Sequence, residues 1–155
     1  MKFRVYQLFY LAALALLIAS LFMPVTQYIE SNGATSVVTN FSILQPDGTY
    51  SYTVCALGVV LVFTALVNVF ALLLSFFQNF ELQKRVAILG VLLLTGYYLL
   101  LLIVSLLMIE GVGMTMEVAT ILPFIALILY VMSFLSTRRT EAKILATAAG
   151  FRLRD

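Results

Sequence analysis

Two long apolar segments, residues 54–77 and 86–109, follow one another with only the short polar stretch 78–85 between them. Each segment exceeds the roughly 20 residues that an α-helix needs to cross a bilayer. Neither contains an acidic, basic or histidine side chain, and such side chains are costly in hydrocarbon. The pattern predicts two adjacent membrane-spanning helices joined by a tight turn.

Two further apolar segments, residues 5–23 and 118–135, predict a first and a fourth span. A cleavable signal peptide is the alternative for residues 5–23, but the run is longer than the usual signal core of about 7–15 residues. The chain is 63% hydrophobic and 10% charged, whereas soluble proteins average roughly 45–50% and 25%. We therefore expect an all-α membrane protein, a four-transmembrane-helix bundle forming a single domain over residues 1–155.

The first outer loop, residues 24–53, is patterned like β-structure. An Asn-Gly pair at residues 32–33 and a Pro-Asp-Gly triplet at residues 46–48 are turn signals, because Asn and Gly tolerate positive φ and Pro fixes φ at about −65°. The flanking residues alternate or are rich in β-branched types. A small antiparallel β-meander is predicted, with strands at residues 25–30, 35–44 and 49–54; an irregular loop packed by its aromatic residues is the alternative.

All nine basic residues fall on one predicted side of the membrane. Six of them are expected topology anchors: Lys2, Arg4, Lys84, Arg85, Arg138 and Arg139. The tail, residues 136–155, adds Lys143, Arg152 and Arg154, while the opposite loops hold Glu30, Asp47, Glu110 and Glu117 and no Lys or Arg. Because cytoplasmic loops carry the excess of Lys and Arg, we expect both termini and the central turn in the cytoplasm.

The tail also shows helical spacing at Ile144, Leu145, Ala148 and Phe151. It is predicted either to continue the fourth helix or to form a separate amphipathic helix on the membrane surface. In either form, the cations of the tail would attract anionic lipid or dock a cytoplasmic partner, and of these two interpretations we favour the lipid.

Residue types that commonly carry chemistry are scarce. The sequence has no histidine and a single cysteine, Cys55, so it lacks the commonest general base and metal ligand and has no pair of thiols for a disulfide. A net charge of +2 is too small to indicate nucleic acid as a partner. No span carries an ionisable group at its centre, where ion-driven transporters place theirs. We expect no catalytic residue, no metal and no cofactor.

One face of the second span carries polar residues. Thr64, Asn68 and Ser75 recur at helical spacing, and Asn79 continues them into the turn. Tyr97 lies near the middle of the third span, so its hydroxyl needs a buried partner, for which Asn68 or Thr64 is predicted. These five residues form an expected interhelical polar seam; the alternative for Asn68 is that it lines a small polar cavity or binds a lipid headgroup.

Small residues also repeat at helical spacing, namely Ala12, Ala15 and Ala19 in the first span and Ala119, Ala126 and Ser133 in the fourth. They allow close helix approach, either within the bundle, which we favour, or between two copies of the chain. The expected partners are therefore membrane lipid and another membrane protein or a second copy.

The layout as a whole is similar to an uncharacterised family of four-helix inner-membrane proteins from Bacteroidetes, a domain of unknown function. The resemblance rests on the short basic start, the first span ending in Met23-Pro24, the variable outer loop, the tight basic turn at Gln83-Lys84-Arg85, the proline-bearing fourth span and the basic tail. Its most family-like residues are Arg138, Arg139 and Glu141, followed by Arg152-Leu153-Arg154. It implies a bacterial inner membrane and no assigned activity. Four spans with a β-meander in the first outer loop also resemble the claudin layout, in geometry alone.

The favoured hypothesis is a non-enzymatic accessory or scaffold subunit whose outer meander and basic tail face partners. The alternative is a lipid- or hydrophobe-binding protein, or one that modifies lipid, with a cavity between the helices near Asn68 and Tyr97. A small channel is a third hypothesis, but the sequence shows no ring of charges and no filter-like motif.

Overall fold

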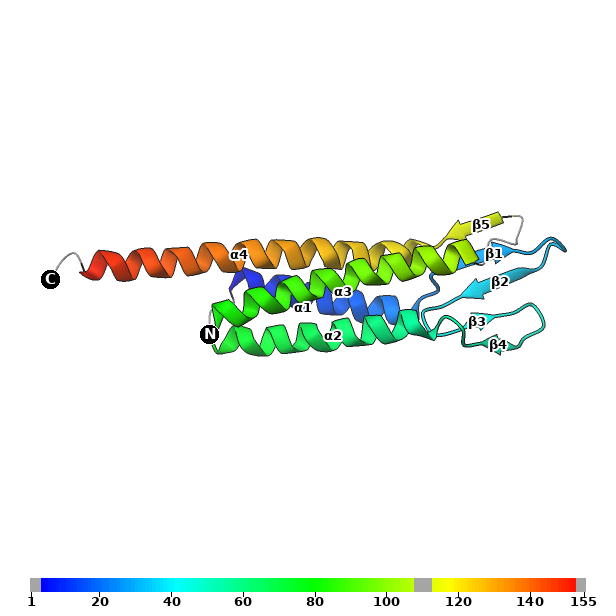
Figure 1. The fold of residues 1–155 in the computed structure, drawn as a ribbon, viewed down its shortest axis with the longest axis horizontal. Coiled ribbons are helices and arrows are strands. Elements are labelled where there is room, and N and C mark those ends of the chain that lie inside the picture. Colours follow the sequence, from blue (N-terminus) through cyan, green and yellow to red (C-terminus); the bar gives the residue numbers. More distant parts are fainter. Residues whose placement is uncertain (1–3, 108–112, 153–155) are drawn as a thin grey trace.

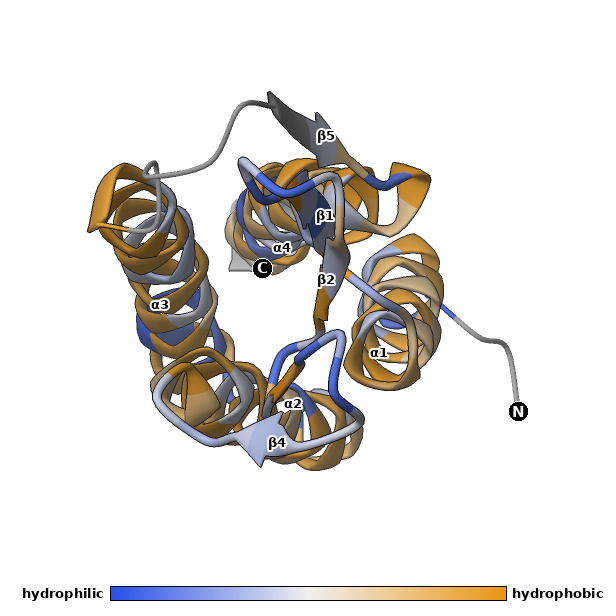
Figure 2. Cartoon of the chain, turned by 90° about the vertical axis from the view of Figure 1, so that its right-hand side faces the viewer, coloured by the Kyte–Doolittle hydropathy of each residue, from blue (hydrophilic) through white to orange (hydrophobic). Residues whose placement is uncertain are grey.

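Four long helices account for most of the structure, a computed structural model that describes residues 4–107 and 113–152. They are α1 (Val5–Phe22), α2 (Cys55–Phe76), α3 (Phe80–Leu107) and α4 (Ile121–Arg152). Each helix packs against the next one in sequence, and α4 closes the ring against α1 (Figure 1, Figure 2). The predicted four-helix bundle is confirmed.

The outer faces of the helices are apolar, whereas the interior holds polar side chains together with an apolar core. Leu66 and Leu92, for example, are 61% and 63% exposed, whereas Asn68 and Gln83 are fully buried. Hydrocarbon offers no hydrogen bonds, so polar groups in a membrane protein must be satisfied inside the protein. All four helices are long and apolar enough to cross a membrane, which by length and composition makes the chain a multi-pass membrane protein.

A five-stranded antiparallel sheet caps one end of the bundle, which we call the sheet end (Figure 1). Its strands are β1 (Thr26–Ile29), β2 (Thr35–Val38), β3 (Ile43–Leu44), β4 (Tyr50–Ser51) and β5 (Gly113–Met116), in the order β4-β3-β2-β1-β5. The first four lie between α1 and α2, which confirms the predicted meander. β5 lies between α3 and α4 and pairs with β1; the sequence does not predict it, because four residues alternate too briefly to be recognised.

The predicted single strand at residues 35–44 is wrong in one respect, because the chain reverses at residues 39–42. The N–H and the hydroxyl of Thr39 both donate to the Ser42 carbonyl, at 2.8 and 2.9 Å. Val38 consequently pairs with Ile43, and both side chains are buried. A threonine that hydrogen-bonds locally offers the backbone an alternative to the ladder, which breaks the β-branched run in two.

α3 begins at Phe80, earlier than the predicted span, so the polar stretch between α2 and α3 shrinks to a short turn. Gln78 adopts a φ of 55° in this turn, and Asn79 Oδ1 accepts the Leu82 N–H at 3.2 Å. Glu81 lies in the first turn of α3, where the negative charge of an acidic side chain interacts favourably with the positive end of the helix dipole. Glu, Lys and Arg are good helix formers, so these polar residues extend the helix beyond the apolar segment.

α4 continues through the tail as one helix, which confirms the first of the two predicted alternatives and excludes a separate surface helix over these residues. It has 32 residues, or about 48 Å at 1.5 Å per residue, and it projects past the ends of the other helices (Figure 1). Lys84 of α3 binds Glu141 at 2.8 Å where α4 leaves the bundle. Beyond that ion pair, residues 142–150 are exposed.

The small-residue stripes have two different environments. Ala126 and Ser133 of α4 are fully buried and Ala119 is 8% exposed, so that stripe packs within the bundle as expected. Ala12 and Ala15 of α1 are exposed, so the prediction that the first stripe packs within the chain is wrong. The difference arises because α1 turns its tyrosines and Gln7 inward instead.

Candidate functional site

The interior of the bundle holds polar side chains from all four helices, which we call the polar core. No member is more than 9% exposed. The members are Gln7 and Tyr10 from α1, Thr64, Asn68 and Ser75 from α2, Gln83 from α3, and Tyr130, Ser133 and Thr137 from α4. Polar groups in apolar surroundings are costly unless they are paired, so their partners decide what this interior can do.

Three of the predicted seam residues, Thr64, Asn68 and Ser75, share the buried face of α2. The Thr64 hydroxyl donates to the Val60 carbonyl of its own helix at 2.7 Å. Ser75 accepts a hydrogen bond at 3.1 Å from Gln7 Nε2 of α1. Ser75 thus links two helices, whereas Thr64 satisfies its hydroxyl locally.

The other two predicted seam residues lie elsewhere. Asn79 is exposed in the turn, where it caps α3 and does not extend the buried face of α2. Tyr97 is fully buried, but its hydroxyl donates to Asn40 Oδ1 at 2.7 Å and not to Asn68 or Thr64. The predicted partner of Tyr97 is wrong because Tyr97 lies beside the turn between β2 and β3, where Asn40 is within reach of its hydroxyl.

Asn40 joins three helices at the sheet end. Its Nδ2 donates to the Ser20 carbonyl of α1 at 2.7 Å, and its backbone carbonyl accepts the N–H of Gly58 in α2 at 2.7 Å. The third helix is α3, through Tyr97. The ring of Phe41 covers Gly58 so closely that a Cβ there would collide with it. This junction is structural, because both the donor and the acceptor of the buried Asn40 side chain are used within the protein.

Tyr98, the neighbour of Tyr97, makes a second link at the sheet end. Its hydroxyl donates to the Thr120 carbonyl at 2.7 Å, and the Thr120 hydroxyl donates to the Val25 carbonyl at 2.6 Å. The Tyr98 ring packs edge-on against Phe124 of α4, with centroids 6.3 Å apart. The two adjacent tyrosines of α3 therefore connect the sheet to the bundle on two sides.

Four members of the polar core have polar atoms without a partner among the described residues: Tyr10, Asn68, Gln83 and Thr137. Both atoms of the two side-chain amides are affected. A buried amide without a hydrogen bond costs roughly 2–7 kcal/mol. A water molecule or another small polar group bound at these atoms would remove that cost.

The end of the bundle opposite the sheet, which we call the basic end, carries the described topology anchors. Lys84 binds Glu141 at 2.8 Å and Glu81 at 3.3 Å, and Arg85 binds Glu81 at 3.3 Å. The Arg4 and Arg138 guanidinium groups each lie 5.9 Å from a ring centroid, that of Phe80 and that of Phe134. Lys2, Glu110 and Arg154 lie outside the described residues.

Sequence reasoning missed most of the polar core outside α2. Ser133 was predicted to pack within the bundle, but only as a small residue. Tyr130 and Thr137 recur with it at helical spacing, and this periodicity would have shown that the face of α4 is polar. Gln83 was missed for another reason, since the sequence alone places it in the turn before the third span. Its burial follows only from the earlier start of α3.

The side chains of the polar core determine which kinds of interaction it can make. Its side chains are amides and hydroxyls, which donate and accept hydrogen bonds but carry no charge near neutral pH. Among the residues that the structure describes, no three Cys, Asp or Glu side chains come together as metal ligands. The site is therefore suited to neutral, hydrogen-bonding molecules.

Fold and site together define a multi-pass membrane protein with a polar interior and an extramembrane sheet. A family model described as Domain of unknown function (DUF4293) matches residues 4–144. The chain belongs to this family, which confirms the resemblance to a four-helix family of unknown function. A search of curated proteins found no match. The bacterial source and the claudin-like layout are not tested by these findings and stay predictions.

Proposed function

We propose that this chain is a non-enzymatic accessory or scaffold subunit of a membrane complex. The observation that carries the proposal is the projection of α4 past the bundle, where residues 142–150 are exposed. Ile144 and Leu145 on this segment are 42% and 63% exposed. An isolated helix shorter than about 12–15 residues is marginal in water, so a bound protein would supply the contacts that the projecting segment lacks.

The non-enzymatic part of the proposal is supported by the residue types of the chain. The sequence contains no histidine, and the polar core consists of amides and hydroxyls. General acid–base catalysis usually relies on a group with a pKa near the working pH. The polar core offers hydrogen bonds but no such group.

The test is an affinity purification after gentle solubilisation. We expect the full chain to retain a second membrane protein in fixed stoichiometry, and Ile144→Lys with Leu145→Lys to lose it. Ala142→Lys with Ala146→Lys is the matched control, because it adds the same charge to a different face of the exposed helix, about 130° away at 100° per residue. Recovery of the wild type only as a monomer or as copies of itself would contradict the proposal, as would equal loss in the control.

We also propose that the protein lies in a bacterial inner membrane with both termini in the cytoplasm. The described basic residues gather at the end of the bundle opposite Glu30 and Asp47 of the sheet end, as the positive-inside rule expects. Lys84→Glu with Arg85→Glu should disturb the orientation of a reporter fused to the C-terminus. The same fusion on the wild type is the control, and an unchanged orientation would refute the anchoring role.

A second candidate function is the binding of a lipid or another hydrophobic molecule with a polar group, in a cavity near Asn68. One observation favours it: Asn68 is fully buried, and neither side-chain atom has a partner among the described residues. A ligand that hydrogen-bonds to this amide would remove the cost of burying it. Asn68→Leu should then abolish co-purification of the ligand in native mass spectrometry.

The matched control for Asn68→Leu is Val69→Leu, on the neighbouring residue, which is 41% exposed on the outer face of α2. A bound molecule that both variants retain would argue against a site at Asn68. Stabilisation by Asn68→Leu, with no ligand detected in the wild type, would show that the amide has no polar partner of any kind.

A further inference from the structure

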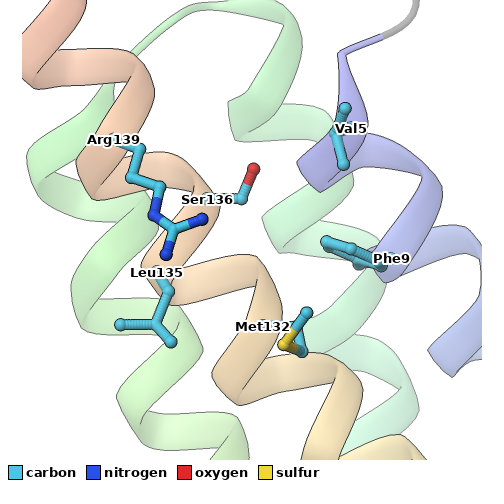
Figure 3. A pocket seen from close by; sticks show the side chains of 6 residues that line it. All are labelled: Val5, Phe9, Met132, Leu135, Ser136 and Arg139. Atoms are coloured by element: carbon cyan, nitrogen blue, oxygen red, sulfur yellow. The ribbon is translucent and has the colours of Figure 1, made fainter.

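A groove of about 170 Å³ lies between α1 and α4 at the basic end of the bundle (Figure 3). It is separate from the polar core and opens on the outer surface of the bundle. Its lining residues are Val5, Phe9, Met132, Leu135, Ser136 and Arg139. We call it the α1–α4 groove.

The α1–α4 groove has an apolar part and a polar part. Val5, Met132 and Leu135 are 59%, 45% and 42% exposed, so they present hydrocarbon at the surface that faces lipid. Ser136 and Arg139 lie three positions apart on α4, which places them on the same face of the helix. A molecule that fills the groove must therefore be apolar along one part and polar, with negative charge, at the other.

The direction of the Arg139 side chain determines where its positive charge lies along the bundle. Side chains in a helix lean toward the N-terminus of that helix, and the N-terminus of α4 lies at the sheet end (Figure 1). Arg139 accordingly points back along α4, and Figure 3 shows its guanidinium group between its own backbone and Leu135. The cation is thus directed toward the apolar part of the bundle and not away from it.

Arg139 is also available for a ligand. The described salt bridges at the basic end join Lys84 and Arg85 to Glu81 and Glu141, and none of them includes Arg139. Arg138 lies over the Phe134 ring. A guanidinium group matches the geometry of phosphate oxygens with two parallel hydrogen bonds. The charge of Arg139 therefore complements a phosphate at the mouth of the groove.

We propose that the α1–α4 groove binds a phospholipid with an anionic headgroup. Its phosphate accepts hydrogen bonds from the Arg139 guanidinium and the Ser136 hydroxyl, and an acyl chain lies over Phe9 and Met132. A free phosphate would leave the apolar part of the groove unused, whereas a phospholipid occupies both parts. The lipid bridges α1 and α4 on the outer side of the bundle.

The test uses the purified full chain in detergent, titrated with phosphatidylglycerol and, separately, with phosphatidylcholine of the same acyl chains. Native mass spectrometry measures the bound fraction. We expect the wild type to retain phosphatidylglycerol in preference to phosphatidylcholine, and Arg139→Gln to weaken that retention roughly tenfold or more, because hydrogen bonds to charged groups are among the stronger ones. Arg139→Lys, which keeps the charge but loses the planar fork, should be intermediate.

Arg138→Gln is the matched control, because it removes the same charge from the adjacent exposed residue. Equal weakening by Arg138→Gln and Arg139→Gln would overturn the proposal in favour of diffuse attraction. Displacement of the lipid by millimolar inorganic phosphate would show that phosphate alone is the ligand, which also overturns it. Arg139 is exposed, so both variants should melt like the wild type, and the readout reports binding and not folding.

Discussion

Replacing Asn40 by alanine tests the hydrogen-bonded junction at the sheet end. Asn40 is fully buried, donates to the Ser20 carbonyl at 2.7 Å and accepts from the Tyr97 hydroxyl at 2.7 Å. Asn40→Ala removes both bonds and leaves the two partner groups buried without a hydrogen bond. We expect the variant to be markedly less stable than the wild type.

The magnitude follows from the two groups that Asn40→Ala leaves unpaired. Each buried group without a hydrogen bond costs about 1–3 kcal/mol, so the free energy of unfolding should fall by roughly 2–6 kcal/mol. For a chain of this size, 1 kcal/mol shifts the melting temperature by roughly 2–4 °C. A decrease of about 10 °C is therefore expected when melting is followed in detergent by circular dichroism.

Tyr97→Phe separates the two contributions, because it removes only the hydrogen bond to Asn40. It should cost about 1–3 kcal/mol. The double variant should cost less than the sum of the single variants, since they share one bond.

The control is Asn32→Ala, in an exposed turn where Asn32 Oδ1 accepts only the Ala34 N–H at 2.9 Å. Surface substitutions of this kind usually change stability by about 0.5 kcal/mol or less. If Asn40→Ala melted at the same temperature as Asn32→Ala, the argument that this junction holds the sheet to the bundle would be wrong.

Two further predictions concern the packing of α3 against α4. Gly90→Ala should lower the melting temperature, because the added Cβ would lie 2.5 Å from the Tyr130 ring. Gly96→Ala is the control and should not lower it, because no atom lies within 4 Å of the Cβ added there. Equal melting temperatures for the two variants would refute close packing at Gly90. Glu141→Gln should raise hydrogen exchange in residues 142–150, because it removes the ion pair with Lys84 where α4 leaves the bundle. Arg85→Gln, which touches only the exposed pair with Glu81, should leave that exchange unchanged, and equal exchange in both variants would show that the ion pair does not hold the helix.

The spans were predictable because apolar length is a local property of the sequence. Residues 54–77 and 86–109 contain no charged group, and only a helix satisfies its own backbone in hydrocarbon. The boundaries were less predictable, because polar residues with high helix propensity extended α3 at its start and α4 at its end. In the loop, the turn signals predicted the meander, but the reversal at residues 39–42 depends on hydrogen bonds of Thr39 that no periodicity reveals.

The candidate site was predicted on α2, and the same helical spacing could have shown its part on α4. The spacing of Thr64, Asn68 and Ser75 places them on one face, and the helical period alone is sufficient for that statement. Which residues face them from other helices depends on how the helices rotate and slide against one another. Tyr97 illustrates the difference, because its partner is 57 positions away in the sequence, in a loop.

By itself, the sequence determined that the chain has four apolar spans, a polar β-rich loop after the first span, and its basic residues grouped apart from the loop carboxylates. These properties depend on the composition of contiguous segments. Only the tertiary structure decided that Asn40 joins three helices, that Asn68 and Gln83 lack partners among the described residues, and that Arg139 borders an apolar groove. Such pairings bring distant segments together, and the packing of the whole bundle determines which groups meet.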